Sequence, residues 1–457
     1  MQKMFSPRQK FMAMSKFTIL TLYLLGGSCF GMPQGTDCDL SYAPPPYDDG
    51  GRTLVPIDIE QQHVSWLIAG DLTSVEAVSE LTFSVEEAGY PVILLNPNST
   101  GSIVSKGESA PVTLKKMDAS PFSKSNFYYI DKILEPGTYE LQLKYSFNPD
   151  LEKSYFLPIQ YNKHAFGEAG IPSNYSYDHF KLTLDVTIKH PTPDKYRFIT
   201  NGIVTPGETT NSFRAEYPPH YTSMSFFIDV VDSEKVIERK FQKPSIDGRE
   251  IDFLVYSTWS EVAVEVYQAL ITWDFPKIEK TFGPYPYQKL IIKTFGAESP
   301  TNLAGAFSGA VLMPIDYANE SFHEFGHSWY MQNLSPALGD DMWIYEGLGW
   351  WAPNYLRASR NDRDQKFNQY IDMSANPYSL SSNLWIHEAG AAVLAEIDGQ
   401  LQCKGGLLKY LREIHTYKMR DGGIHNRTLS TREFKALLEE YSGENLDEIF
   451  TYYFKDY

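Results

Sequence analysis

The sequence predicts a multidomain α+β protein, in which an antiparallel β domain is followed by a mostly helical domain. Three observations lead to this prediction. At 457 residues the chain is too long for one ordinary hydrophobic core, so two or three domains are expected. Before about residue 241, apolar residues alternate with polar ones in short runs. After about residue 246, apolar residues recur with helical spacing instead.

The first 31 residues have the features of a secretory signal peptide. Basic residues up to Lys16 precede a short apolar run at 17–25, and small residues follow it. The run is too short to be a good membrane span, so we expect an exported protein, either periplasmic or secreted. Initiation at Met14 would give a signal of more ordinary length, and the sequence leaves the start open. A faint resemblance to a bacterial lipoprotein cleavage box makes lipidation at Cys29 an alternative.

Residues 32–52 are predicted to be a flexible linker. Proline, glycine and aspartate crowd residues 43–51, a composition that disfavours packing. If the signal is cleaved near Gly31, Cys38 and Cys403 remain in the mature chain. Export would permit a disulfide between them, but two free thiols fit a flexible leader equally well, so both alternatives stay open.

Residues 53–241 are predicted to form the β domain. The run 139–145 alternates between apolar and polar residues directly after a turn at 135–137. The run 180–188 alternates in the same way. Period-two runs divided by glycine and proline indicate a largely antiparallel sheet with one buried face. No residues with catalytic spacing are found in this part of the sequence.

Residues 246–457 are predicted to form the second domain. Short apolar runs at 290–292 and 305–313 each predict a strand. Helical spacing of apolar residues predicts the other elements, which are helices at 259–282, around 321–330, around Glu346, from about 384 to 401, at 407–417 and at 432–441.

One motif in the second domain has the spacing of a metal site. His323 and His327 are four residues apart, so both imidazoles stand on one helix face and can reach one ion. Glu324 follows the first histidine, on the side where a general base would act on water. Glu346 follows after 18 intervening residues and would be the third ligand. Three nitrogen and oxygen ligands with a fourth position open match catalytic zinc, so we expect one zinc ion per chain.

The competing interpretation is a helix that carries two solvated histidines. A chance His-Glu-x-x-His is expected in roughly one of a hundred such chains. However, Phe322, Phe325 and Trp329 interleave with the histidines, as in a buried helix, where an unpaired carboxylate at 324 would be costly. A metal ion would give these groups a partner, and we therefore favour the zinc site.

The net charge of the chain limits the kinds of partner that it can bind. A formal net charge of −17 argues against nucleic acid and anionic membranes. The expected partner is a peptide or protein substrate at the zinc site. The sequence does not determine the oligomeric state.

The zinc segment resembles that of the gluzincin metallopeptidases close to aminopeptidase N and leukotriene A4 hydrolase. In that family, His-Glu-x-x-His is followed after 18 residues by a glutamate inside a Trp-x-x-Glu-Gly phrase, which matches 323–327 and 343–347. Phrases at 282–286 and 134–141 are also similar to family segments, and bacterial glycyl aminopeptidases show a second, similar relation. The resemblance implies an N-terminal β saddle, a thermolysin-like catalytic domain and zinc-dependent hydrolysis of peptide bonds.

The chain departs from this family where the substrate amine is anchored. The family motif Gly-Ala-Met-Glu-Asn aligns with 305–309, and Gly305, Ala306 and Ser308 are the candidate substrate-binding residues. Ser308 replaces the glutamate, and a hydroxyl cannot form the charge-assisted hydrogen bond that selects an N-terminal ammonium. Aminopeptidase specificity is therefore in doubt unless another carboxylate, such as Glu298, takes over.

A second departure concerns the transition state. The family places a tyrosine before Glu-Lys-Gly, and its hydroxyl stabilises the oxyanion; the aligned residue here is His387. An imidazole N–H can also donate to an oxyanion, and losing such a donor costs about two to three orders of magnitude in rate. His387 is therefore a candidate catalytic residue beside Glu324. The alternative is that His387 has no role and that Tyr378 or Tyr410 serves instead.

Two functional hypotheses remain. The first is an exported zinc metallopeptidase, aminopeptidase-like but with altered recognition of the N-terminal amine. The second is a zinc-stabilised, non-catalytic peptide-binding protein, which the substitutions at Ser308 and His387 favour. The intact Glu324 favours the enzyme, because structural zinc sites have no need of that carboxylate and are usually closed by four protein ligands.

Overall fold

The structure is a computed structural model of the chain. It describes residues 39–96, 98–105, 108–117, 127–148, 161–162, 165–166, 170–192, 194–297, 304–316, 321–331, 334–337, 341–356, 371–372, 386–418 and 427–455. All of them belong to one compact unit, Asp37–Tyr457. No helix in these ranges is long and apolar enough to cross a membrane. The predicted signal peptide, Cys29 and Cys38 lie outside the described residues, so the predicted alternatives for these cysteines stay predictions.

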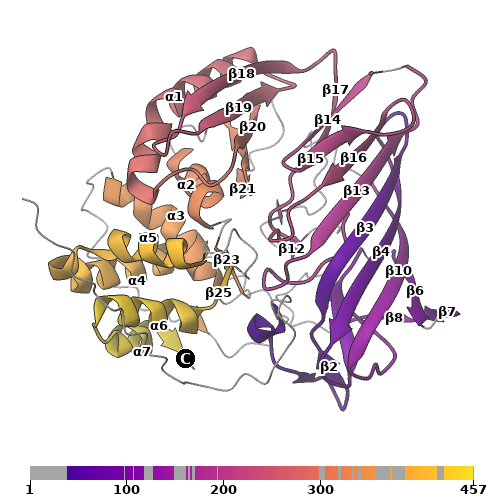
Figure 1. Cartoon of the computed structure of the whole chain (residues 1–457), viewed down its shortest axis with the longest axis horizontal. Helices are drawn as coiled ribbons and strands as arrows, with labels where there is room; N and C mark the ends of the chain where they lie inside the picture. Colours follow the sequence, from indigo (N-terminus) through magenta and orange to yellow (C-terminus); the bar gives the residue numbers. More distant parts are fainter. Residues whose placement is uncertain are drawn as a thin grey trace, which may run out of the picture. The chain divides into compact units, whose positions relative to one another are not determined.

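The first part of the chain builds an eight-stranded sheet (Figure 1). Its strands lie in the order β15 (Ile203–Pro206), β16 (Ser212–Glu216), β13 (Lys181–Ile188), β3 (Asp58–Ile68), β4 (Val75–Val85), β10 (Gly137–Phe147), β6 (Thr100–Ser105) and β7 (Glu108–Val112). The predicted runs 139–145 and 180–188 lie in β10 and β13, where buried and more exposed side chains alternate. Neighbouring strands are antiparallel, except that β13 pairs with β3 in parallel. The prediction of a β-rich, largely antiparallel N-terminal region is confirmed.

Alternation along these strands buries one face of the sheet in a continuous apolar core, which includes Trp66, Phe83, Leu141, Leu143 and Leu184. Smaller sheets accompany it. A five-stranded sheet has the order β1 (Tyr47–Asp48), β2 (Thr53–Val55), β5 (Tyr90–Leu94), β9 (Phe127–Ile130) and β8 (Leu114–Lys116). Two-stranded ribbons pair β14 (Tyr196–Thr200) with β17 (Ile228–Asp232), and β11 (Tyr161–Asn162) with β12 (Ala165–Phe166).

The segment predicted to be a flexible linker packs where the structure describes it. Residues Asp39–Tyr42 form a 3-10 helix, η1, and β1 pairs with β2. The Tyr42 hydroxyl donates to Glu433 Oε1 at 3.0 Å and accepts from Lys418 Nζ at 2.8 Å. The expectation of a linker that does not pack is therefore wrong for residues 39–48. The prediction rested on local composition, which does not show that Tyr42 binds the buried Lys418 from a distant part of the chain.

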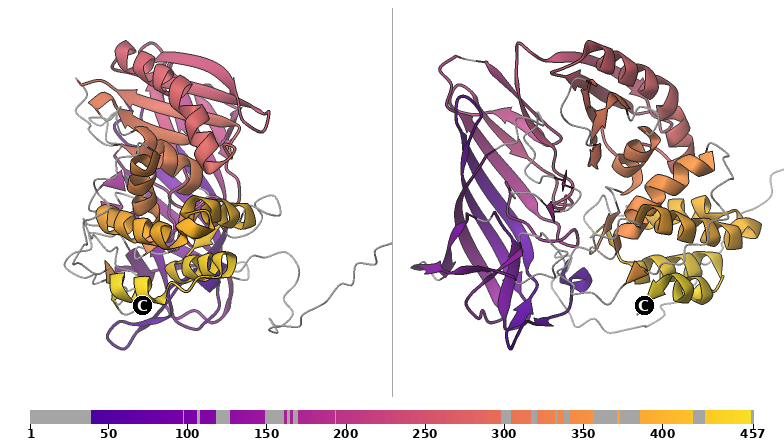
Figure 2. Two further views of the ribbon diagram at one scale, coloured as in Figure 1. Left: turned by 90° about the vertical axis from the view of Figure 1, so that its left-hand side faces the viewer. Right: turned by 180° about the vertical axis from the view of Figure 1, so that it is seen from behind.

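A second sheet begins before the predicted domain division. Its order is β18 (Ile237–Pro244), β19 (Glu250–Ser257), β20 (Lys289–Phe295), β22 (Ala310–Pro314) and β21 (Gly305–Phe307). Helix α1 (Glu261–Phe282), capped by the Ser260 side chain, packs against β18, β19 and β20 (Figures 1 and 2). Because β18 pairs with β19, the predicted division at 241–246 falls within a strand of this sheet.

The predicted single strand at 305–313 is a hairpin. Phe307 pairs with Ala310, and Ser308 and Gly309 make the turn between β21 and β22. Gly309 has a φ of +75°, a conformation that glycine adopts without steric cost. The sequence pattern did not predict the turn, because Ser308 and Gly309 alone interrupt the apolar run between β21 and β22.

The remaining elements are mainly helical. They are α2 (Ser321–Gly326), the π-helical turn η4 (His327–Met331), α3 (Met342–Leu356), α4 (Ile386–Leu401), the 3-10 helix η7 (Gln402–Lys404), α5 (Leu407–Lys418), α6 (Thr431–Ser442) and α7 (Asp447–Tyr453). Two short pairs join β23 (Ser335–Pro336) to β25 (Thr428–Leu429) and β24 (Ile371–Asp372) to β26 (Phe454–Lys455). The helices predicted from apolar spacing are present, but the five-stranded sheet makes this part less helical than predicted.

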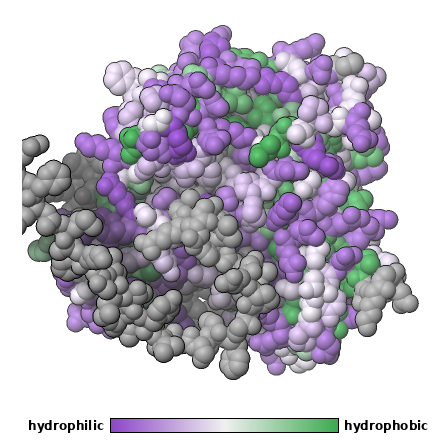
Figure 3. Space-filling model, in the orientation of Figure 1, coloured by the Kyte–Doolittle hydropathy of each residue, from purple (hydrophilic) through white to green (hydrophobic). Residues whose placement is uncertain are grey.

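Hydrophilic residues predominate on the face shown in Figure 3, with smaller apolar areas between them. Among the described residues, Val262 and Trp273 on α1 are the most exposed large apolar side chains apart from Ile203. The polar character of this face agrees with the high net charge of the sequence.

Candidate metal centre

Two histidines project from the same short helix. His323 lies in α2, and His327 begins the π-helical turn η4 that continues it. Their Nε2 atoms are 2.9 Å apart. Single π turns within helices occur frequently at functional sites. The ring of His327 is buried and stacks on Tyr345, with ring centroids 4.0 Å apart, so the side chain is held firmly in place.

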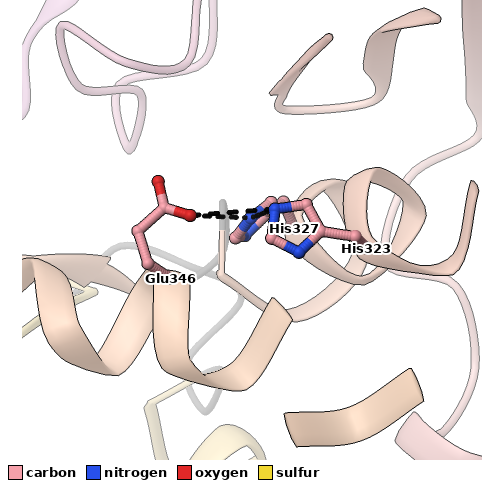
Figure 4. A group of neighbouring side chains, drawn as sticks. All are labelled: His323, His327 and Glu346. Carbon is pink, nitrogen blue, oxygen red and sulfur yellow. Dashed lines mark hydrogen bonds and ion pairs between the residues drawn. The ribbon is translucent and has the colours of Figure 1, made fainter. Parts of the chain in front are cut away.

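Glu346 reaches the two histidines from α3 (Figure 4). Its Oε2 lies 3.7 Å from His323 Nε2 and 3.5 Å from His327 Nε2. Ligands about 2.0–2.1 Å from a tetrahedral zinc ion lie about 3.3 Å from one another. The three observed separations bracket this value, so the structure brings the predicted ligands together in a spacing that fits a zinc ion.

The protonation states also fit a metal site. Burial, and next electrostatic interaction with the neighbouring His327, lower the pKa of His323 to about 3, so this imidazole is neutral near pH 7. Burial opposes ionisation of Glu346, but hydrogen bonds from His327 and His387 outweigh it and hold the pKa well below its usual range. A neutral imidazole and an ionised carboxylate are the forms that bind a metal ion.

Gly349, on α3, orients His323, the first of the predicted ligands, and the sequence prediction missed this glycine. Its backbone hydrogen-bonds the His323 ring. A Cβ at this position would lie 2.7 Å from His323 Nδ1, closer than packed atoms come. The bond therefore engages the Nδ1 side of the ring and leaves Nε2 directed at the ligand cluster, as partners of metal-ligating histidines do. The spacing of two glycines within one helix was the available signal, since glycine there needs a packing reason.

His387 lies beside the third ligand. It projects from α4, and its Nε2 is 2.8 Å from Glu346 Oε2. Its side chain is 38% exposed, and its ring centroid is 6.0 Å from that of Trp350. Tyr410, one of the predicted alternatives, is buried in α5, and its hydroxyl donates to the backbone oxygen of Lys404 at 3.2 Å. Tyr378, the other alternative, lies outside the described residues.

Comparison with known proteins relates this fold to that of solved structures. No protein-family model and no curated protein matches the sequence. Among solved structures, an M1 zinc metallopeptidase from Deinococcus radiodurans superposes with a TM-score of 0.60 at 15% identity, over 87% of this chain and 94% of that one. This chain has the M1 zinc metallopeptidase fold. A mutant of the Deinococcus M1 enzyme bound to a Tyr-Ser-Ala substrate gives a TM-score of 0.58 at 14% identity, over 87% and 94%.

A two-domain M1 zinc metallopeptidase mutant bound to L-arginine is similarly related, with a TM-score of 0.59 at 14% identity, over 87% and 94% of the two chains. The resemblance to the gluzincin family that the zinc segment suggested is thus confirmed at the level of the fold. The match covers almost the full length of the M1 structures, so it includes the β-rich region as well as the part that holds the ligand cluster.

Within the M1 fold, the predicted substrate-binding residues lie at the edge of the second sheet. Gly305 and Ala306 belong to β21, the edge strand, which contacts α2. Ser308 is buried in the hairpin turn, where its carbonyl accepts from Asn201 Nδ2 at 2.7 Å and its N–H donates to Ser225 O at 3.3 Å. The chain before β18 therefore holds this turn in place. Glu298 lies outside the described residues.

Glu324, the predicted general base, is a buried residue of α2. Its negative charge adds to the effect of burial in raising the pKa of Tyr267, so the two side chains share one poorly solvated region. A carboxylate in such a region interacts strongly with nearby charges. The residue thus lies on the ligand helix in surroundings that water screens poorly.

Proposed function

We propose that this protein is a zinc-dependent metallopeptidase. The observation that carries the proposal is the cluster of His323, His327 and Glu346, whose ligand atoms all lie within 4.8 Å of one another. Proteins of the same fold are zinc metallopeptidases, and one of them holds a Tyr-Ser-Ala substrate. The proposal assigns one zinc ion to this chain and a peptide or protein as its substrate.

The proposed mechanism assigns the proton transfers to one carboxylate. When bound, zinc supplies a Lewis acid that lowers the pKa of a water ligand and polarises the scissile carbonyl. Glu324 takes a proton from the attacking water and then passes it to the leaving amine. Its place next to His323 on α2, and its burial, support this assignment.

His387 is the candidate for the donor that stabilises the oxyanion. Its Nε2 lies 2.8 Å from the carboxylate oxygen of Glu346, so the ring is at the edge of the ligand cluster. An imidazole there could take the part of the hydroxyl that tyrosine supplies in the related family, and catalysis gains most from donors that are already in position.

Substrate recognition is proposed to differ from that of an ordinary aminopeptidase. Among the described residues, β21 is the outermost strand of the second sheet and contacts α2, and an extended peptide can add to a sheet edge as a further strand. Ser308 supplies no carboxylate for an N-terminal ammonium. We therefore propose a thermolysin-like catalytic domain in which recognition of the substrate amine is altered. We also propose that the protein is exported, as the N-terminal sequence predicts.

The decisive experiment uses one peptide in two forms, with a free and with an acetylated N-terminus. The purified zinc-loaded protein should cleave at least one form, and a chelator should abolish cleavage until zinc is restored. Cleavage of the free form alone would show an amine anchor other than Ser308. Equal cleavage of both would show an endopeptidase.

The alternative function is a zinc-stabilised peptide-binding protein, which the replacements at Ser308 and His387 favour. It predicts no cleavage of either peptide form, nor of a wider peptide library, by protein whose zinc content is one per chain. That outcome would overturn the metallopeptidase proposal. Binding of the same peptides without turnover would then support the alternative.

A further inference from the structure

The contact between His387 and Glu346 involves the oxygen that faces the other ligands. His387 Nε2 is 2.8 Å from Glu346 Oε2, and the same Oε2 is the atom measured at 3.7 Å and 3.5 Å from the two histidines of α2. His387 thus touches the ligand atom itself, although it lies about forty residues away in the sequence.

His387 is not a member of the ligand cluster. Among the described residues, the group whose ligand atoms are mutually within 4.8 Å consists of His323, His327 and Glu346. The His387 ring lies nearly parallel to that of His323, with centroids 6.1 Å apart, and the ring of Trp350 lies within 6.4 Å of both. The geometry is that of a partner that hydrogen-bonds a ligand from outside the cluster.

Two glycines let the helices that carry Glu346 and His387 approach closely. A Cβ on Gly390 of α4 would lie 2.5 Å from Trp343 O and 2.9 Å from Gly347 Cα of α3. A Cβ on Gly347 would lie 2.6 Å from the carbonyl carbon of Gly390. Real side chains do not pack so closely against backbone, so any other residue would force the helices apart. Gly347 directly follows Glu346, and Gly390 is less than one turn from His387.

We propose that His387 is a positioning residue that holds the Glu346 carboxylate toward His323 and His327. The close crossing of α3 and α4 at Gly347 and Gly390 brings His387 within hydrogen-bond distance of Glu346. The inference rests on the proposed function for the identity of the metal. Groups that hydrogen-bond metal ligands fix their orientation, and their loss typically weakens metal affinity about 10- to 100-fold. A neutral imidazole has one N–H, so a neutral ring that donates to Glu346 from Nε2 has only an acceptor at Nδ1 and would need a second proton to serve as the oxyanion donor as well.

The test measures zinc affinity of the full chain by competition with a chromophoric chelator. His387→Ala should bind zinc about 10- to 100-fold more weakly than the parent. His387→Gln, whose amide can still donate, should recover part of this loss. Since the His387 side chain is 38% exposed, both variants are expected to fold, and thermal unfolding checks this.

The helix crossing has its own matched pair of variants on α4. Gly390→Ala should weaken zinc binding about as much as His387→Ala, because its Cβ collides with α3. Gly399→Ala should leave zinc affinity unchanged, since a Cβ there meets nothing within 4 Å. Equal zinc affinity in the parent and in His387→Ala would overturn the proposal, even if kcat fell, because the ring would then act on the transition state alone. If no variant cleaves peptides, the proposed function fails, whereas the zinc affinities still decide the role of His387.

Discussion

At the scale of single residues, burial sets the chemistry of the ligand cluster. It lowers the pKa of His323 to about 3, while hydrogen bonds from His327 and His387 overcome its effect on Glu346 and lower the pKa of that carboxyl. Both groups are therefore already in their metal-binding forms near pH 7. Zinc binding consequently requires no proton release from these two side chains.

Replacing Glu324 by glutamine should separate catalysis from metal binding. Glutamine keeps the shape of the side chain but cannot accept the proton, so turnover should fall about 10²- to 10⁴-fold while zinc content stays at the level of the parent. Turnover per bound zinc and metal analysis of the same preparations test this. Glu265→Gln, at an exposed position of α1, is the control and should change neither. Undiminished turnover in Glu324→Gln would contradict the mechanism.

Two histidines away from the ligand cluster should make stability depend on pH. Burial, and next the charge of Arg427, lower the pKa of His220 to about 3 and that of His415 to about 4. In the unfolded chain both protonate near pH 6.5, so the unfolded state binds more protons below that pH. The free energy of unfolding should therefore fall as pH decreases from about 6.5 to 4, by about 1 kcal/mol per pH unit for each histidine.

Urea unfolding of the metal-free protein at several pH values measures this dependence without interference from zinc release. His415→Phe keeps an aromatic ring beside Tyr330, whose ring centroid is 5.3 Å away, but it cannot be protonated. The variant should show a shallower loss of stability on acidification. An identical slope in parent and variant would show that His415 does not carry the effect.

At the scale of elements, the N-terminal 3-10 helix is joined to the far end of the chain. Lys418, at the end of α5, binds both the Tyr42 hydroxyl and Glu433 of α6. Tyr42→Phe removes one acceptor of a buried ammonium and should lower the free energy of unfolding by about 1 to 2 kcal/mol, measured by urea unfolding. Tyr452→Phe, at a 45% exposed position of α7, should change it by less than about 0.5 kcal/mol. Equal stability of the two variants would refute the role of Tyr42.

At the scale of the whole molecule, a buried ion pair joins the β14–β17 ribbon to the second sheet. Lys293 Nζ of β20 lies 2.8 Å from Asp229 Oδ2 of β17, and both side chains are 1% exposed. The Tyr256 hydroxyl of β19 donates to the same oxygen at 2.6 Å. The pair lies beside apolar side chains of both sheets, such as Val231 of β17 and Phe295 of β20, so an unpaired charge there would be poorly solvated.

Lys293→Met should destabilise the protein strongly, because it leaves the Asp229 carboxylate buried without its cation. Removing one partner of a buried pair costs about 3 to 5 kcal/mol. Lys240→Met is the matched control: its ammonium pairs with Glu238 on the surface, where such pairs are worth about 0 to 1 kcal/mol. Unfolding free energies from denaturant titration compare the two. A similar small effect in both would show that the buried pair contributes little.

The sequence alone determined the features that depend on local spacing. His323 and His327 stand on one helix face because they are four residues apart, and the alternation in 139–145 and 180–188 specifies strands with one buried face. Such patterns act within a single element, so they can be read without knowing what the element packs against. The predicted linker shows the limit of composition, because η1 is held by Lys418 from the other end of the chain.

Tertiary structure decided which distant residues complete the site. His387 reaches Glu346 because Gly347 and Gly390 let two helices cross closely, and Asn201 holds the Ser308 turn across 107 residues. Neither contact follows from spacing along the chain. Contacts between elements depend on how whole surfaces fit together, and that fit is settled by packing of many side chains at once rather than by any local pattern.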